Sequence, residues 1–192
     1  DVAQGRTSSS PTFVGRLGTR VLLTLQGGGH GRELWISDGS SAGTQLVKDI
    51  EPGTRSGGFI GLARMGAFYY GFARTLATGF ELFRTDGTAA GTSLVKDIRA
   101  GRSGSSGISI TAAVLGSALY FAADDGVHGT ELWKTDGSAA GTVLVKDCFP
   151  GPLSGIPMFL ETFGTRLIFT AAQPNVGGRF DFEPWISDGT TA

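Results

Sequence analysis

The chain has 192 residues, of which 40% are hydrophobic, so it is long enough to bury the core of a compact domain. Its 16 basic and 17 acidic side chains give a net charge of −1, which argues against nucleic acid as a partner. No apolar run approaches the roughly 20 residues of a membrane-spanning helix, and the first ten residues, "DVAQGRTSSS", lack the pattern of a signal peptide.

Four related units follow one another along the chain, at residues 1–48, 49–96, 97–146 and an incomplete 147–192, which we take as one domain. Two markers recur in every unit: a glycine before an apolar run, and a Glu that opens a stretch such as "ELWISDGS". The markers are Gly18, Gly66, Gly116 and Gly164, and Glu33, Glu81, Glu131 and Glu183. Successive Glu residues lie 48, 50 and 52 positions apart, a period that indicates a repeat architecture.

The third unit shows the expected strands most clearly, as four short runs rich in β-branched and aromatic residues. They are residues 108–116, 118–124, 130–136 and 142–148. No segment has an apolar stripe at helical spacing, so we expect no helix. Four short antiparallel strands in each period of this length are typical of propeller blades. We therefore predict an all-β fold, a β-propeller of four blades of about 48 residues with four antiparallel strands each, the fourth blade lacking its outer strand.

Within the third unit, the last two strands are expected to pair as a hairpin. The simplest register places Glu131 opposite Lys146, Trp133 opposite Leu144 and Thr135 opposite Thr142. The same arithmetic pairs Glu33 with Lys48 and Glu81 with Lys96. The Asp-Gly pair between the strands suits a reversing turn, since Asp accepts backbone hydrogen bonds and Gly tolerates positive φ. We expect the tryptophans of the units to pack between blades.

The stretches "ELWISDGS", "ELFRTDGT", "ELWKTDGS" and "EPWISDGT" cover the length of the chain at regular intervals. In these motifs the chain resembles the ELWxxDGT repeat family, whose tandem units occur in large secreted or surface-associated bacterial proteins, notably of myxobacteria. The resemblance implies an extracellular or cell-surface location, and it supplies no catalytic residues. Phe83 replaces the Trp of the motif and Pro184 replaces its Leu. Because Pro removes a ladder donor, we expect its strand to be altered near its start or to lie at a sheet edge.

Carboxylates recur in the turns of all four units, at Asp38, Asp86, Asp136 and Asp188. Each is a candidate calcium ligand, because calcium prefers hard oxygen ligands. The chain has no D-x-D-x-D spacing that would supply six or more oxygens, so the turn itself is the favoured explanation. Asp49, Asp97 and Asp147 are interpreted in the same way. We predict no cofactor, with calcium as the alternative.

Three further features raise the question of a chemical site. Asp124 and Asp125 beside His128 form the densest polar cluster, which we expect to be an exposed loop. His30 and His128 occupy equivalent places in different units, which favours two blade-edge loops over one metal site. Cys148 aligns with hydrophobic residues of the other units and is expected to be a buried hydrophobe. We assign no catalytic, cofactor-binding or metal-binding residue.

Two classes of function fit these observations. The first is a non-catalytic propeller that acts as a binding scaffold for a protein or a glycan. The second is a hydrolase or lyase with carboxylates from different blades in the central channel, and a structural segment of a larger array is a further alternative. The near-identity of the units favours the first, because an active site needs unlike residues on different blades. Convergent carboxylates in the channel would favour the enzyme, and exposed aromatics on one rim would favour a glycan.

The ends of the sequence prompt a last expectation. The fourth unit stops before a "GTxLVK" stretch of its own. Four units of this size suit a small ring, so we expect the first and fourth blades to touch and close it, with a segment of a longer array as the alternative. The open edge of the fourth blade after Ser187 is then expected to pair with another chain, including a second copy of this one.

Overall fold

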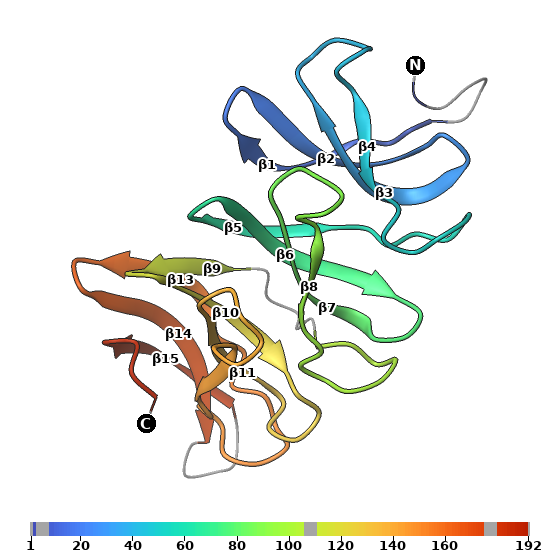
Figure 1. Ribbon diagram of the computed structural model, residues 1–192. Helices are drawn as coiled ribbons and strands as arrows, with labels where there is room; N and C mark the ends of the chain where they lie inside the picture. Colours follow the sequence, from blue (N-terminus) through green and yellow to red (C-terminus); the bar gives the residue numbers. More distant parts are fainter. Residues whose placement is uncertain (1, 3–7, 106–110, 175–179, 192) are drawn as a thin grey trace.

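The computed structural model describes residues 2, 8–105, 111–174 and 180–191, and this part of the chain consists of strands joined by turns and loops (Figure 1). The first blade contains β1 (Thr12–Leu17), β2 (Arg20–Gly27), β3 (His30–Ser37) and β4 (Gln45–Lys48). The second contains β5 (Ile60–Met65), β6 (Phe68–Thr75), β7 (Gly79–Thr85) and β8 (Ser93–Lys96). The third contains β9 (Ala112–Leu115), β10 (Ala118–Asp124), β11 (Thr130–Thr135) and β12 (Val143–Lys146), and the fourth contains β13 (Met158–Phe163), β14 (Arg166–Pro174) and β15 (Phe180–Ser187).

Each sheet is antiparallel, and its strands lie side by side in sequence order. The first three sheets have four strands and the fourth has three, which confirms the predicted four-bladed, all-β propeller fold. In the third unit the last three predicted strands correspond to β10, β11 and β12, while the start of the first one lies outside the described residues. Pro184 lies in β15, which is the edge strand of its sheet, as expected. The described residues include no helix that could cross a membrane.

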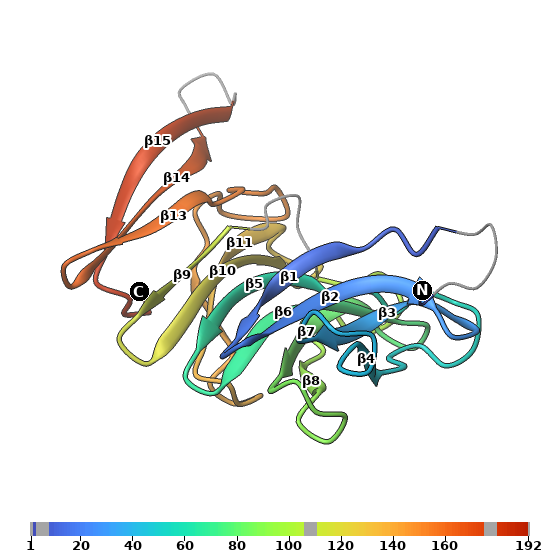
Figure 2. The same cartoon turned by 90° about the horizontal axis from the view of Figure 1, so that it is seen from above.

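The four blades form an open arc and not a closed ring. Contacts between blades run from β1 to β5, from β5 to β9 and from β9 to β13, so the first strand of each blade lies on the inner side of the arc. The first and fourth blades lie at opposite ends in both views (Figures 1 and 2). The expectation of a closed four-bladed ring is therefore wrong.

Three hydrophobic clusters lie between successive blades and form the core. Trp133 belongs to the cluster between the second and third blades, together with Phe72 and Phe121, whose rings meet edge to face at 6.0 Å. Its side chain is 6% exposed, so the predicted packing between blades is confirmed. Phe83 takes the equivalent place between the first and second blades. In the second, third and fourth blades the repeated aromatic residue therefore packs against the preceding blade, whereas Trp35 of the first blade is buried outside the three clusters.

The predicted pairing of the repeated Glu and Lys is wrong by one residue. Trp133 does lie opposite Leu144, but a bulge before it places Lys146 opposite Leu132 and not opposite Glu131. The same shift places Lys48 opposite Leu34, and Lys96 opposite Leu82. Directly opposed residues share a sheet face, so each Lys points to the side of the following blade. Simple index arithmetic could not find the bulge, because it assumes a regular ladder.

Candidate functional site

The repeated Glu is a buried acceptor for the segment that crosses from one blade to the next. Glu131 is fully buried, and its carboxylate accepts hydrogen bonds from Cys148 N at 2.6 Å and Gly155 N at 2.5 Å. A Cβ atom on Gly155 would lie 2.7 Å from Glu131 Oε2, so only glycine allows this approach. Glu33 and Glu81 hold the equivalent segments, through the donors Ile50 N, Gly57 N, Ile98 N, Arg99 N and Ser105 Oγ.

Burial changes the acidity of these carboxyl groups. Loss of hydration raises the pKa of Glu81 and of Glu131 to about 7, and it also raises the pKa of Glu33. The hydrogen bonds that each group accepts oppose this rise without cancelling it. A carboxyl group with a pKa near 7 is a common sign of an active site. Here the group is enclosed by backbone amides of its own chain, so a substrate has no access to it.

The Asp residues of the four turns are used within the turns. Asp136 Oδ1 accepts hydrogen bonds from Ser138 N at 2.8 Å and from Ser138 Oγ at 2.7 Å. Gly137 follows with a φ of 97°, which is the predicted reversal. Asp38, Asp86 and Asp188 make the same two bonds. These bonds lower the pKa of all four carboxyl groups and account for their recurrence without a metal.

The histidines lie apart, each beside a carboxylate of its own. His30 Nδ1 is 2.7 Å from Asp49 Oδ2, and His128 Nδ1 is 2.8 Å from Asp125 Oδ2. Asp124 forms an ion pair with Arg99 at 2.5 Å. The described residues include no group of three His, Cys, Asp or Glu side chains that could hold a metal. Asp125 therefore holds the loop that carries His128, and Asp124 ties its strand to Arg99 in the crossover from the second blade.

Cys148 has the predicted character of a small hydrophobe. It is 3% exposed and packs in the cluster between the third and fourth blades. Burial, together with the nearby Glu131 carboxylate, raises the pKa of its thiol to about 12. Nucleophilic chemistry requires the thiolate. With this pKa the thiol of Cys148 stays protonated near neutral pH.

The inner side of the arc is poor in acids. The described strands β1, β5, β9 and β13 contain one carboxylate between them, Glu161. Aromatic residues suited to sugar stacking are also withdrawn from the surface. Tyr70, Tyr120 and Trp133 are each less than a tenth exposed and lie in the interblade clusters. The described residues thus offer neither convergent carboxylates nor an open platform of Trp and Tyr side chains.

The fourth blade has an exposed apolar face, whereas the equivalent face of each other blade is covered. Ile168 in β14 is 38% exposed, whereas its counterparts Leu22, Tyr70 and Tyr120 are 0%, 3% and 4% exposed. The register places Ile186 opposite Ile168, and it is 64% exposed. The same blade also carries exposed aromatic side chains, which are Phe159, Phe163, Phe180 and Phe182. We call the side of this sheet that bears Ile168, Phe182 and Ile186 the open face.

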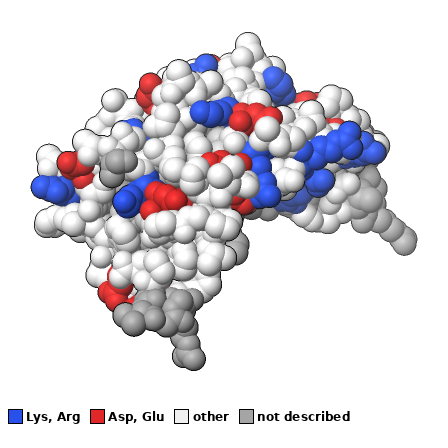
Figure 3. All heavy atoms as spheres, turned by 90° about the horizontal axis from the view of Figure 1, so that it is seen from below, with Lys and Arg blue, Asp and Glu red and all other residues white. Residues whose placement is uncertain are grey.

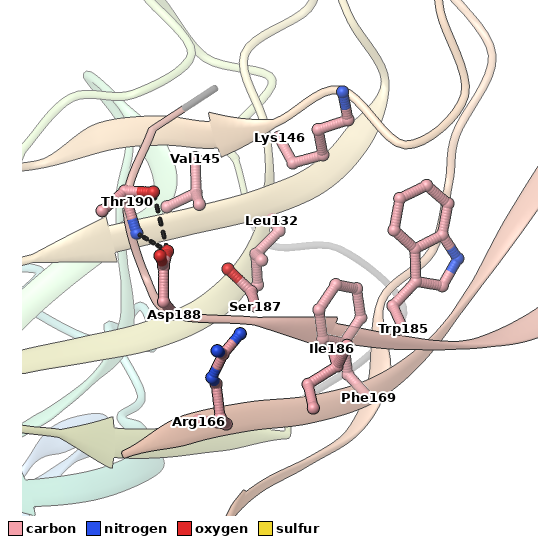
Figure 4. Close-up of a pocket in the computed structure, with 10 residues that line it drawn as sticks. All are labelled: Leu132, Val145, Lys146, Arg166, Phe169, Trp185, Ile186, Ser187, Asp188 and Thr190. Carbon is pink, nitrogen blue, oxygen red and sulfur yellow. Dashed lines mark hydrogen bonds between the residues drawn. The ribbon is translucent and has the colours of Figure 1, made fainter.

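A cavity of about 270 Å³ lies between the third and fourth blades, next to the outer edge of β15 (Figure 4). Leu132, Phe169 and Trp185 supply apolar walls, and Lys146, Arg166 and Asp188 supply charges. In Figure 4 Lys146 and Trp185 lie at one end of the cavity, and Asp188 with Thr190 lies at the other. The lining of the cavity is therefore mixed, with apolar side chains beside two cations, a carboxylate and two hydroxyl groups.

A second hollow, of about 490 Å³, lies between the first two blades. Phe13, Phe59 and Phe80 contribute apolar walls, and Arg32 and Arg74 contribute cations. Arg32 is held by Ser10 O, Thr12 Oγ1 and Thr24 O. Comparison of the units could not reveal this hollow or the open face, because residues that differ between units line both of them.

The side of the molecule shown in Figure 3 carries charges of both signs. Basic and acidic side chains lie close together over much of this side, a larger group of mainly basic side chains lies toward the right-hand end, and uncharged areas separate them. This distribution agrees with the net charge of −1. Recognition by this chain is therefore expected to depend on shape and apolar contact more than on long-range attraction.

No family model matches the chain, and no curated protein matches it. Solved structures do share its fold at low sequence identity. A structure from a study of two prolyl endopeptidases is 12% identical over 94% of this chain, with a TM-score of 0.51. A structure of puromycin hydrolase is 14% identical over 95% of this chain, also with a TM-score of 0.51. In both cases the match covers 27% of the other chain, so this chain spans about a quarter of their length.

Proposed function

We propose that the chain is a non-catalytic β-propeller repeat module that binds a protein partner through its fourth blade. In keeping with the resemblance to ELWxxDGT repeats, we place this binding scaffold outside the cell or at the cell surface. The observation that carries the proposal is the open face, where Ile168 is exposed although its counterparts in blades one to three are buried, and where Ile186 is exposed opposite it. Exposed apolar patches on a folded chain commonly mark interaction sites.

Two features support binding over catalysis. The repeated polar residues already make structural hydrogen bonds, Glu131 to the crossover between two blades and Asp136 within its own turn. Glu161 is the single carboxylate in the described inner strands, whereas hydrolysis of a glycoside uses a pair of carboxyl groups. A protein partner is favoured over a glycan because the open face offers Phe and Ile side chains, which pack against apolar side chains of another protein.

The proposal can be tested with a single charged substitution on the open face. Phe182→Lys is expected to lower the fluorescence of a bound uncharged apolar dye, Nile red, by about half, because it places a charge in the apolar patch. Leu153→Lys is the control, since Leu153 is 50% exposed in a loop and Phe182 is 46% exposed. The same two variants would be applied to an array of apolar peptides and to a glycan array. Binding to peptides that Phe182→Lys alone removes supports the proposal, and glycan binding that survives Phe182→Lys contradicts it.

A further inference from the structure

The hollow of about 490 Å³ between the first two blades is lined by both buried and exposed apolar side chains. Phe59 is 3% exposed, and its carbonyl oxygen accepts a hydrogen bond from Thr24 Oγ1 at 2.9 Å, which ties the crossover to β2. Phe13 and Ile60 are 61% and 40% exposed. The volume lies within the roughly 300–1,000 Å³ of pockets that bind small molecules, and such pockets are mostly apolar with a few polar groups.

Two arginines line the hollow, and none of its described lining residues is acidic. Arg32 donates to Ser10 O, Thr12 Oγ1 and Thr24 O, which are all uncharged acceptors. These bonds hold the guanidinium in place without neutralising its charge. Arg74 forms no ion pair within the described residues. The lining thus favours an anion, and guanidinium groups suit a carboxylate because they bind its two oxygens through paired hydrogen bonds.

The two cations are specific to the interface between the first and second blades. Arg32 comes directly before the repeated Glu of its unit, and Arg74 lies eight residues after the marker glycine of the next unit. The other interfaces have no such pair of cations at the equivalent places, so the repeat itself does not require them. The equivalent pairs are Phe80 with Asp124 between the second and third blades, and Thr130 with Ala172 between the third and fourth.

An ion pair with Glu51 would be the ordinary explanation for Arg74. The equivalent residues of the next interface, Arg99 and Asp124, do form such a pair at 2.5 Å. Glu51 and Arg74 form none, although both line a neighbouring hollow of about 410 Å³. Glu51 instead accepts a hydrogen bond from Leu76 N at 2.8 Å. The guanidinium of Arg74 is therefore available to a ligand.

Glycine keeps part of the hollow open at Gly58. A Cβ atom on Gly58 would meet no atom within 4 Å, so a larger side chain there would enter open space. Ile156 holds the equivalent place between the third and fourth blades. Its amide donates to Thr130 O at 2.9 Å, as the amide of Gly58 donates to Arg32 O at 2.8 Å. Both residues have a positive φ, 47° for Ile156 and 56° for Gly58, so the fold accepts an isoleucine at this place.

We propose that the hollow between the first and second blades binds a small organic acid, in which one carboxylate is joined to an apolar or aromatic body. The carboxylate lies between Arg32 and Arg74, and the body packs on Phe13 and Ile60. This inference goes beyond the proposed function and does not depend on it, because no residue of the open face lines the hollow.

The probes are naphthalene-2-carboxylate and the uncharged naphthalene-2-carboxamide, which share a ring system and differ in charge. Each is titrated into the whole chain, and binding is followed by nuclear magnetic resonance at backbone amides and at the Nε–H groups of arginine. The carboxylate is expected to bind about tenfold more tightly than the amide, because it alone forms charge-assisted hydrogen bonds. The signals of Arg32, Arg74 and Ile60 are expected to shift.

Two substitutions test the two parts of the site. Arg74→Gln is expected to weaken binding of the carboxylate about tenfold and to leave binding of the amide unchanged. Gly58→Ile copies Ile156 and is expected to weaken binding of both probes about tenfold or more, because its side chain fills the space of the ligand body. Arg20→Gln is the control, since Arg20 is exposed, carries the same charge and does not line the hollow. Thermal unfolding checks that each variant is folded.

Four outcomes overturn the inference. They are equal binding of the two probes, an unchanged affinity in Arg74→Gln, shifts confined to other blades, and no shift at millimolar probe. Equal losses in Arg74→Gln and Arg20→Gln also contradict it, because they would show a general attraction to positive charge. The result for Arg74→Gln decides the matter if Gly58→Ile fails to fold.

Discussion

Replacing Glu131 by alanine is expected to lower the free energy of unfolding by about 3–5 kcal/mol, measured by urea denaturation. The substitution removes the acceptor of two buried backbone donors, Cys148 N and Gly155 N. Each buried donor without a partner costs about 1–3 kcal/mol, and the vacated volume adds to the loss. The crossover from the third blade to the fourth would loosen first, because the carboxylate holds both ends of it.

Glu183→Ala is the matched control, because Glu183 holds the same place in the repeat and is exposed. Its expected cost is below about 0.5 kcal/mol, as for an ordinary surface substitution. Equal losses in the two variants would show that the repeated Glu stabilises its own hairpin and not the crossover.

Glu131→Gln tests the same carboxyl group through pH. Burial raises the pKa of Glu131 from 4.5 to about 7, so between these values the folded state holds a proton that the unfolded state has released. Stability contributed in this way is present at low pH and is lost as the pH rises toward about 7. The parent chain should lose up to about 1.4 kcal/mol per pH unit from this group, and Glu131→Gln should lack that slope. An unchanged slope in the variant would mean that Glu131 titrates normally.

Trp133→Ala is expected to lower the free energy of unfolding by about 3–5 kcal/mol, the usual cost of removing a large buried aromatic side chain. Trp133 is 6% exposed between the second and third blades. Its Nε1 has no hydrogen-bond partner within the described residues, so the loss comes from packing and from the cavity that remains. Thermal or urea unfolding, followed by far-ultraviolet circular dichroism, measures it.

Trp185→Ala is the comparison variant, because Trp185 occupies the equivalent position and is only partly buried. The free energy of unfolding should fall clearly less in Trp185→Ala than in Trp133→Ala, although the ring of Trp185 stacks on Phe169 at 6.1 Å. A cost below about 0.5 kcal/mol for Trp133→Ala would show that the indole contributes little to packing and would remove the explanation for its recurrence.

Much of the fold could be read from the repeats. The period and the β-branched runs identified four blades, and the turn chemistry of Asp136-Gly137 followed from Asp accepting hydrogen bonds and Gly adopting positive φ. The alignment of Cys148 with hydrophobic residues predicted its burial. These predictions depend on local chemistry and on residues that recur, so a single sequence contains enough information for them.

Three features could not be derived in this way. The bulge that separates Glu131 from Lys146 is a local irregularity of the ladder, and the sequence has no signal for it. The open arc depends on how neighbouring sheets pack along their whole interfaces, which no single repeated motif specifies. The open face around Ile168 did leave a trace, since Phe182 and Ile186 alternate in "FDFEPWIS", but their exposure depends on what lies beside the sheet.

The repeated buried Glu residues fasten the crossovers between blades, and hydrogen exchange at single amides tests this most directly. The amides of Ile50, Ile98 and Cys148, which donate to the buried Glu residues, should be protected as strongly as those in the central strands β2, β6 and β10. Crossover amides that exchange as fast as those of an exposed loop, such as the one that carries Leu153, would contradict the account.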